Sequence, residues 1–169
     1  YERAVEHAEP DRAVTYLLKI GALYEDHLDD PVQAIHSYRR ILDRDARYLG
    51  AIHALQRVTE AGGRYAEFVE ALVLEAELTP DRAHKVGLLS RAGEVLDEHL
   101  NDREAAIAVL RRVVTLDPRY IPALTALGRM YYRAGRWEDL LSTYQAELAV
   151  LGDDARAVPL LLKVGELTE

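Results

Sequence analysis

The amino-acid sequence repeats itself with a fixed period, and this period constrains the fold more than any other feature. The period equals the separation along the sequence between Leu17 and Leu89. Residues of the first copy that return one period later include Leu17, Gly21, His27, Ala34, Asp45, Tyr48 and Arg57, which return as Leu89, Gly93, His99, Ala106, Asp117, Tyr120 and Arg129. A third copy begins where R-A-V-P-L-L-L-K-V-G at 156–165 echoes R-A-V-T-Y-L-L-K-I-G at 12–21. A fixed period is typical of repeat proteins. Because the third copy is incomplete, we expect the full-length protein to continue.

Each copy has the pattern of two helical hairpins. Apolar residues follow the i, i+3, i+4, i+7 spacing of one helix face, as in Leu17, Ile20, Gly21 and Tyr24. The pattern predicts helices over residues 11–28, 31–43, 48–61, 64–78, 80–100, 103–115, 120–134, 136–151 and 155–168, and residues 1–9 resemble the end of a preceding helix. Helices of about 15 residues are marginal alone in water. We therefore expect each hairpin to stack on its neighbour in a solenoid.

Helix-breaking and capping residues mark the ends of these segments. Asp30-Pro31 predicts an N-cap followed by proline at the first helical position, with Gln33 in the capping-box place. Asn101 and Glu104 are predicted to form the corresponding box in the second copy. Gly62-Gly63 and Gly135 predict helix C-caps. Gly21, Gly93, Ala34 and Ala106 are expected where two helices approach closely.

The fourth hairpin carries a recognisable set of positions. They are Leu124, Leu127-Gly128, Tyr131, Gly135, Trp137, Leu140, Tyr144 and Glu147. This set resembles the tetratricopeptide repeat (TPR) family, in the multi-repeat form of bacterial members. The spacing departs slightly from that family, because equivalent positions such as Leu17 and Ile52 lie a little further apart than one family repeat.

The resemblance implies an all-α fold, a right-handed α-solenoid of four TPR-like hairpins with partial helices at both ends. The hairpins would occupy residues 11–45, 46–79, 80–117 and 118–152, and a partial fifth repeat would occupy 153–169. Residues 1–169 would then form a single solenoid domain. In the last repeat, Leu160, Leu161 and Val164 are expected to pack on the fourth hairpin.

Charge and composition exclude several function classes. The formal net charge is −8, from 29 acidic and 21 basic residues, which disfavours nucleic-acid binding. The chain has no cysteine, so disulfides, Cys-ligated metal sites and a thiol nucleophile are excluded. No apolar run is long enough to span a bilayer. The HExxH, GxSxG, P-loop and GxGxxG motifs are absent. We expect no enzyme activity, no cofactor and a cytoplasmic location, while the periplasm and secretion stay open.

Two histidines lie in acidic clusters that repeat with the period. His27 stands in E-D-H-L-D-D and His99 in D-E-H-L-N-D. One interpretation is a metal or proton-transfer site, since histidine and carboxylates are common ligands. The other is a residue at the C-terminal end of a helix, where an imidazolium faces the negative end of the helix dipole. The recurrence favours the structural role, and we expect no metal site.

The resemblance also implies a concave groove lined by the first helix of each hairpin. Candidate partner-binding residues at groove positions are His53, Arg57, Glu94, Thr125, Arg129, Tyr132 and Arg133. Further groove positions are Leu18, Ala22, Glu25, Asp26, Glu60, Ser90, Asp97, Glu98, Leu162 and Glu166. The lysine and asparagine of the family's carboxylate clamp are missing there, so binding of a chaperone-type acidic tail is not expected.

The groove arginines have two interpretations. They could anchor the carboxylates or aromatic rings of a partner peptide. Alternatively, Arg57 could pair with Glu94, and Arg129 with Glu94 or Glu166, as salt bridges between helices. Exposed pairs of this kind contribute about 0–1 kcal/mol each. The salt-bridge role is slightly favoured for any single arginine.

The function expected from these patterns is a protein–protein interaction scaffold or adaptor that binds a protein or peptide in the concave groove. One alternative is self-assembly, because uncapped apolar repeat ends could join two copies as a homo-oligomer. A second alternative is an RNA-binding helical repeat, which the acidic balance disfavours. No membrane insertion is expected.

Overall fold

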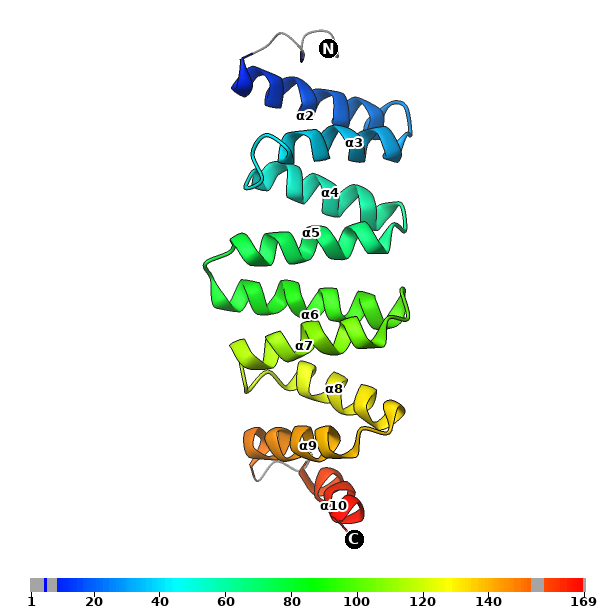
Figure 1. Ribbon diagram of the computed structural model, residues 1–169, viewed down its shortest axis with the longest axis vertical. Coiled ribbons are helices and arrows are strands. Elements are labelled where there is room, and N and C mark those ends of the chain that lie inside the picture. The colour runs from blue at the N-terminus through cyan, green and yellow to red at the C-terminus, as the bar shows by residue number, and fades with distance from the viewer. Residues whose placement is uncertain (1–4, 6–8, 153–156, 169) are drawn as a thin grey trace. The chain divides into compact units, whose positions relative to one another are not determined.

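The computed structural model describes residues 5, 9–152 and 157–168, with the side chains of Pro10 and residues 166–168 excepted. The chain divides into two compact units, Tyr1–Pro80 and Asp81–Glu169. The regular secondary structure of the described residues is α-helical (Figure 1). Unit 1 contains α2 (Pro10–Asp26), α3 (Pro31–Leu42), α4 (Leu49–Ala61) and α5 (Tyr65–Leu78). Unit 2 contains α6 (Arg82–Glu98), α7 (Arg103–Leu116), α8 (Ile121–Ala134), α9 (Trp137–Leu151) and α10 (Ala157–Thr168).

The period of the sequence is visible in where the helices begin. Helices α2 to α5 of unit 1 begin at residues 10, 31, 49 and 65, and α6 to α9 of unit 2 begin at 82, 103, 121 and 137. Each start in unit 2 therefore lies one full period after its counterpart in unit 1. All helices predicted from the sequence are present, with each end within two residues of its expected place. The prediction for residues 1–9 lies almost entirely outside the described residues, and the single solenoid over residues 1–169 stays a prediction.

The turn inside the first hairpin of each unit has the same capping geometry. The Asp30 carboxylate accepts a hydrogen bond from the Gln33 N–H at the start of α3 (3.1 Å), as predicted. In α7 the cap is Asp102, which accepts from the Ala105 N–H (3.1 Å). The predicted box of Asn101 and Glu104 is therefore wrong by one residue. The physical reason is the turn: Asn101 takes a left-handed conformation (φ 51°), which asparagine tolerates well, and leaves the cap to Asp102.

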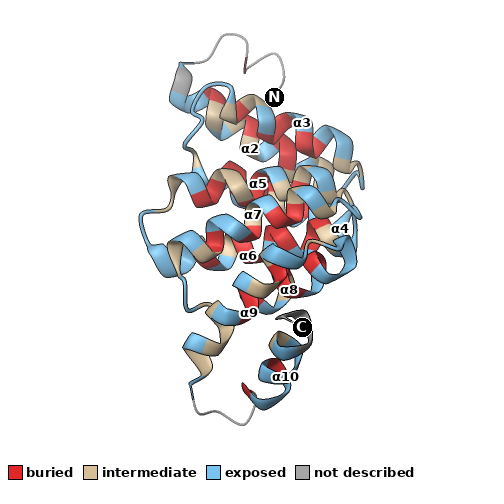
Figure 2. Ribbon diagram, turned by 60° about the horizontal axis from the view of Figure 1, so that its bottom comes forward, coloured by how far each residue is buried: buried red, intermediate tan, exposed pale blue. Residues whose placement is uncertain are grey.

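Within a hairpin, a small residue on one helix admits a large side chain from the other. An added Cβ on Gly21 would lie 2.4 Å from the Tyr38 ring, and one on Gly93 would lie 2.7 Å from Leu110 Cγ. Ala34, on α3, and its counterpart Ala106 are fully buried. Figure 2 shows such buried positions where the helices of a hairpin meet. The predicted close-approach positions are confirmed.

The last helix, α10, packs on α9 through only part of its apolar face. Leu160 is buried and Val164 is half-buried, but Leu161 is 57% exposed, so the expected packing of Leu161 is wrong. Its counterparts Leu17 and Leu89 are buried in hairpins whose second helices cover them. Among the described residues, none lies within 4 Å of a Cβ added to Gly165, which occupies the same sequence position as Gly21 and Gly93.

None of the described helices is both long enough and apolar enough to span a membrane.

The close approach between α6 and α7 gives a test of the packing. Gly93→Ala should destabilise the protein by about 1 kcal/mol or more, because overpacking against Leu110 outweighs the gain in helix propensity. Gly87→Ala is the matched control on the same helix, where, apart from its chain neighbours and the nearby backbone of its own helix, no described atom lies within 4 Å of the added Cβ. It should stabilise by about 0.5–1 kcal/mol. Urea unfolding of both variants checks this, and equal effects at the two glycines would contradict the packing account.

Candidate functional site

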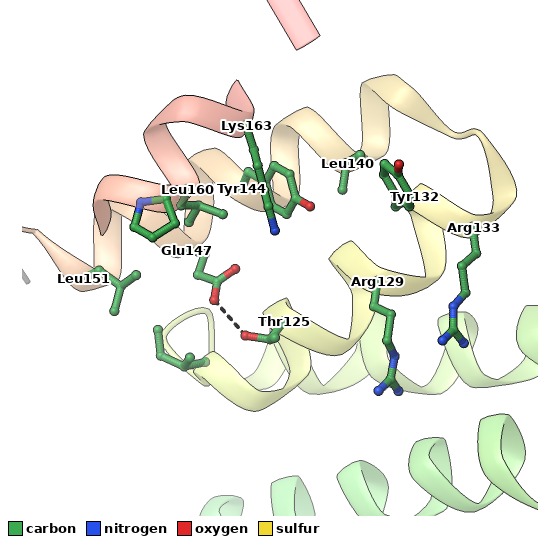
Figure 3. A pocket seen from close by; sticks show the side chains of 12 residues that line it. Thr125, Arg129, Tyr132, Arg133, Leu140, Tyr144, Glu147, Leu151, Leu160 and Lys163 are labelled. Atoms are coloured by element: carbon green, nitrogen blue, oxygen red, sulfur yellow. Dashed lines mark hydrogen bonds between the residues drawn. The ribbon is translucent and has the colours of Figure 1, made fainter. Parts of the chain in front are cut away.

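A pocket of about 710 Å³ lies in unit 2 among α8, α9 and α10 (Figure 3). Four of the candidate partner-binding residues line it, namely Thr125, Arg129, Tyr132 and Arg133, all on α8. They lie on one side of α8 because their spacing of three to four residues follows the helical turn. The structure thus brings together the candidates of the fourth hairpin.

The walls of the pocket are apolar. Side chains from three helices contribute to them, namely Ile121, Leu140, Tyr144, Leu151, Pro159 and Leu160. Leu140 and Leu160 are buried, whereas the polar residues of α8 are exposed at the rim. Desolvation by this burial raises the pKa of Tyr144, so its hydroxyl stays protonated well into the alkaline range. An apolar wall with a few polar groups at its rim is the usual composition of a ligand site.

The charges around the pocket are mainly positive. Arg129, Arg133 and Lys163 line it together with one carboxylate, Glu147. Glu147 Oε1 accepts a hydrogen bond from the Thr125 hydroxyl at 2.7 Å. The Lys163 ammonium lies 5.8 Å from the centroid of the Tyr144 ring, within the range of a cation–π contact. Three cations therefore line this pocket in a chain whose net charge is −8.

The three cations differ in how far they are already engaged. Arg129 Nη2 donates to Asp97 Oδ2 on α6 at 3.0 Å. Arg133 makes no hydrogen bond or ion pair with any described residue. Figure 3 shows the two arginines side by side on α8 with their guanidinium groups pointing the same way.

The counterpart of Arg129 in unit 1 is held more firmly. Arg57 donates two hydrogen bonds to Glu25, from Nε at 2.7 Å and from Nη2 at 2.8 Å. The Tyr38 hydroxyl donates to the same carboxylate at 3.0 Å. The bonds from Arg57 lower the pKa of the Glu25 carboxyl, while burial and then the bond to Glu25 raise the pKa of Tyr38 to about 12.

These two bridges correct the pairing expected from the sequence. Arg57 pairs with Glu25 and not with Glu94, and Arg129 pairs with Asp97 and not with Glu94. The bridging carboxylates occupy equivalent positions, because Asp97 follows Glu25 by one period of the sequence. Each arginine therefore reaches from the first helix of one hairpin back to the first helix of the hairpin before it. The side chain of Glu166, the other expected partner of Arg129, lies outside the described residues.

The remaining candidates do not line this pocket. His53, on α4 in unit 1, lies 3.1 Å from Glu75 Oε1 through its Nε2 atom. Glu94 is exposed on α6, and Leu162 is exposed on α10. Neither is among the residues that line the pocket. The candidate residues that line this pocket are thus those of the fourth hairpin, and the groove over the other hairpins stays a prediction.

The sequence analysis missed further polar and aromatic residues at or beside this site. Glu147 lies on a second helix of a hairpin, and Lys163 lies outside the groove register on α10. Trp137, at the start of α9, makes an edge-to-face contact with Tyr132 (centroids 5.8 Å apart) and is 52% exposed. The sequence analysis named Trp137 only as one position of the resemblance. Its exposure could not be read from spacing alone.

The repeated histidines occupy helix ends. His27 and His99 are the C-cap residues of α2 and α6, and their backbone N–H groups donate to Leu23 and Val95. In the part of the chain that the structure describes, no group of three or more histidine or carboxylate side chains is placed to hold a metal ion.

A known repeat includes most of the residues that line the pocket. The family model of the tetratricopeptide repeat matches residues 123–158, which include most of α8 and all of α9. This part of the chain is therefore a tetratricopeptide repeat. No match is found among curated protein sequences.

Solved structures of TPR proteins share the fold. The MamA protein is 22% identical with a TM-score of 0.52, over 92% of this chain and 82% of that chain. YrrB, described as a TPR protein with an unusual peptide-binding site, is 19% identical with a TM-score of 0.54, over 98% of this chain and 80% of that chain. MamA AMB-1 is 18% identical with a TM-score of 0.53, over 94% and 93% of the two chains. At these identities the likeness establishes the fold.

The two arginine bridges should differ in their contribution to stability. Arg57→Met should lower the free energy of unfolding by about 1–2 kcal/mol at pH 7, and Arg129→Met by less than about 1 kcal/mol, since Arg57 has the additional bond and the partner that Tyr38 orients. Urea unfolding measures both. An equal or larger loss for Arg129→Met would contradict this ranking.

The Arg57 bridge should also depend on pH. The pKa of Glu25 is lowered in the folded protein, so its contribution to stability is present above about pH 4.5 and is lost as the pH falls through the folded pKa. The difference in unfolding free energy between the wild type and Arg57→Met should therefore shrink below about pH 4.5. A difference that stays constant from pH 7 to pH 3 would show that the ion pair does not stabilise the fold.

Proposed function

We propose that this TPR protein is a protein–protein interaction scaffold or adaptor, and that it binds a peptide segment of its partner in the pocket of unit 2. The observation that carries this proposal is the pocket itself, about 710 Å³ with apolar walls and three cations at its rim. Ligand pockets have volumes of about 300–1,000 Å³. The size suits one or two side chains of a peptide rather than a whole folded surface. The unusual peptide-binding site ascribed to YrrB supports the same class of function.

The pocket supplies both affinity and orientation for a peptide. A large apolar side chain inserted between Leu140, Tyr144 and Leu160 would leave water, which stabilises binding by about 1.5–3 kcal/mol for one residue. The cations at the rim would fix the direction of the segment through its carboxylates or carbonyl oxygens. Among the lining residues, the single carboxylate Glu147 is engaged by Thr125, so the arrangement favours binding over catalysis.

The function can be tested with a displayed library of random dodecapeptides. Selection on the wild-type chain should enrich peptides that bind in the pocket. Thr125→Trp, which fills the pocket from its exposed rim, should weaken the enriched peptides at least tenfold. His53→Trp, at the equivalent position of unit 1, is the matched control and should bind them like the wild type. No enrichment, or binding that Thr125→Trp leaves intact, would contradict the proposed site.

Self-assembly is the second candidate function, because one face of α10 is apolar and exposed. Val158, Leu161 and Leu162 are 57–66% exposed on this helix. Exposed apolar patches on soluble chains mark interaction sites. Light scattering at increasing concentration separates the two functions. A constant mass of 19.0 kDa excludes self-assembly of the chain, whereas a dimer mass that Leu161→Glu returns to that of one chain would establish it.

A further inference from the structure

The C-terminal end of α8 differs in chemical character from its counterpart in α4. Glu60 and Ala61 of α4 correspond, one period later, to Tyr132 and Arg133 of α8. The helices themselves begin at equivalent residues, and Arg57 and Arg129 keep the same kind of bridge in both copies. The second copy therefore carries an aromatic ring and a cation where the first carries a carboxylate and a methyl group. The helix does not need this change in order to fold, since α4 forms without it.

Arg133 is the cation at this pocket best placed to bind an anion. Its guanidinium is exposed and has no partner among the described residues, whereas Arg129, one turn earlier on the same helix, donates to Asp97. Asp97 is nearly buried, with its side chain 8% exposed, which keeps Arg129 at that position. A guanidinium presents a planar pair of donors that matches a carboxylate. Arg133 thus offers this geometry to a ligand.

Two exposed aromatic side chains, Tyr132 and Trp137, meet near the end of α8 that carries Arg133. Tyr132 is 62% exposed, and its ring meets the exposed ring of Trp137 edge to face. Tyrosine, tryptophan and arginine are the residue types most enriched where interfaces gain their binding energy. The rings of tyrosine and tryptophan are large, rigid and partly polar, so these residues bind a peptide with little loss of side-chain entropy. The rim formed by Tyr132, Arg133 and Trp137 adjoins the apolar walls, because Tyr132 and Arg133 line the pocket as well.

We infer that this pocket recognises an acidic–apolar segment of another protein, in which a carboxylate binds Arg133 and a neighbouring large apolar side chain enters the pocket. The inference rests on the proposed function and adds the chemical class of the ligand. The charge complementarity is local. The chain as a whole carries −8 and repels acidic partners, so the rim cations must supply the attraction at short range. Recognition should therefore depend on the position of the acidic residue and not on the total charge of the peptide.

The test uses the peptides enriched from the random library. Each peptide is synthesised unchanged and as a set of variants, and in each variant one Asp or Glu is replaced by Asn or Gln. Fluorescence anisotropy gives the dissociation constant of each pair. One Asp or Glu position next to a large apolar residue should be essential, with the amide binding about tenfold or more weakly. Moving the same carboxylate to the other end of the peptide should not restore affinity.

Arg133→Ala tests whether Arg133 is the residue that binds the peptide carboxylate. Alanine is the matched replacement, because α4 carries Ala61 at the equivalent position. In this variant the acid and amide forms should bind with equal affinity. The distant Arg119→Gln is the control and should keep the tenfold preference for the acid. Circular dichroism and melting of Arg133→Ala should match the wild type, because an exposed residue without a described partner is removed.

The outcomes separate the ligand class from the site. If peptides bind in the pocket and are blocked by Thr125→Trp, but tolerate every amide replacement, the acidic–apolar inference is wrong and the proposed function stands. If the preference for the acid disappears in Arg129→Gln and persists in Arg133→Ala, the assignment to Arg133 is overturned. If no peptide binds, both proposals fail. A second copy of this chain as the occupant would show as a dimer in light scattering that an enriched peptide disperses, and it would also overturn the inference.

Discussion

The structure depends on the close approach of paired helices at positions without a large side chain. Gly21 lies against the Tyr38 ring, Gly93 against Leu110, and a Cβ on Gly128 would lie 3.0 Å from Tyr144. Each contact sets how a second helix lies on its first, and so fixes which side chains reach the surface of the hairpin. The pocket in unit 2 follows from the last of these contacts, because Tyr144 is held against α8 and forms part of its wall. A helix pair held further apart would not enclose the same space.

The same helix arrangement occurs in both copies of the repeat, and the differences in side chains between the copies create the candidate site. Both copies join their first helices by an arginine bridge, Arg57 to Glu25 and Arg129 to Asp97. In unit 1, Tyr38 adds a third bond to the bridging carboxylate, while its counterpart in unit 2 is Leu110, which cannot donate. The unit 1 bridge is thus mainly structural. In unit 2 the bridge has fewer hydrogen bonds, and Tyr132 and Arg133 lie close to it on α8. This end of α8 therefore carries an exposed aromatic ring and an exposed guanidinium that α4 does not have.

The sequence predicts the fold well because period, apolar spacing and glycine positions are local signals. It placed each helix end within two residues and identified Gly21 and Gly93 as close-approach positions. The sequence-based prediction failed for side-chain partners and exposures that depend on how two helices cross. The partners of Arg57 and Arg129 are set by that geometry, as are the exposure of Leu161 and the contributions of Lys163 and Trp137 to the site. The resemblance assigned the groove to first helices only, whereas the pocket is also lined by residues of the second helix α9.

The central claim is that partner binding is confined to the last three helices of unit 2, although the helices of both units begin at equivalent positions of the repeat. Backbone amide chemical shifts of the isotope-labelled chain, recorded during titration with a library-selected peptide, test it most directly. The account predicts shift changes at Tyr132, Arg133 and Lys163 and their neighbours on α8, α9 and α10, with α2 to α4 unchanged. Changes centred on His53 and Arg57 in α4, or spread evenly over both units, would contradict it.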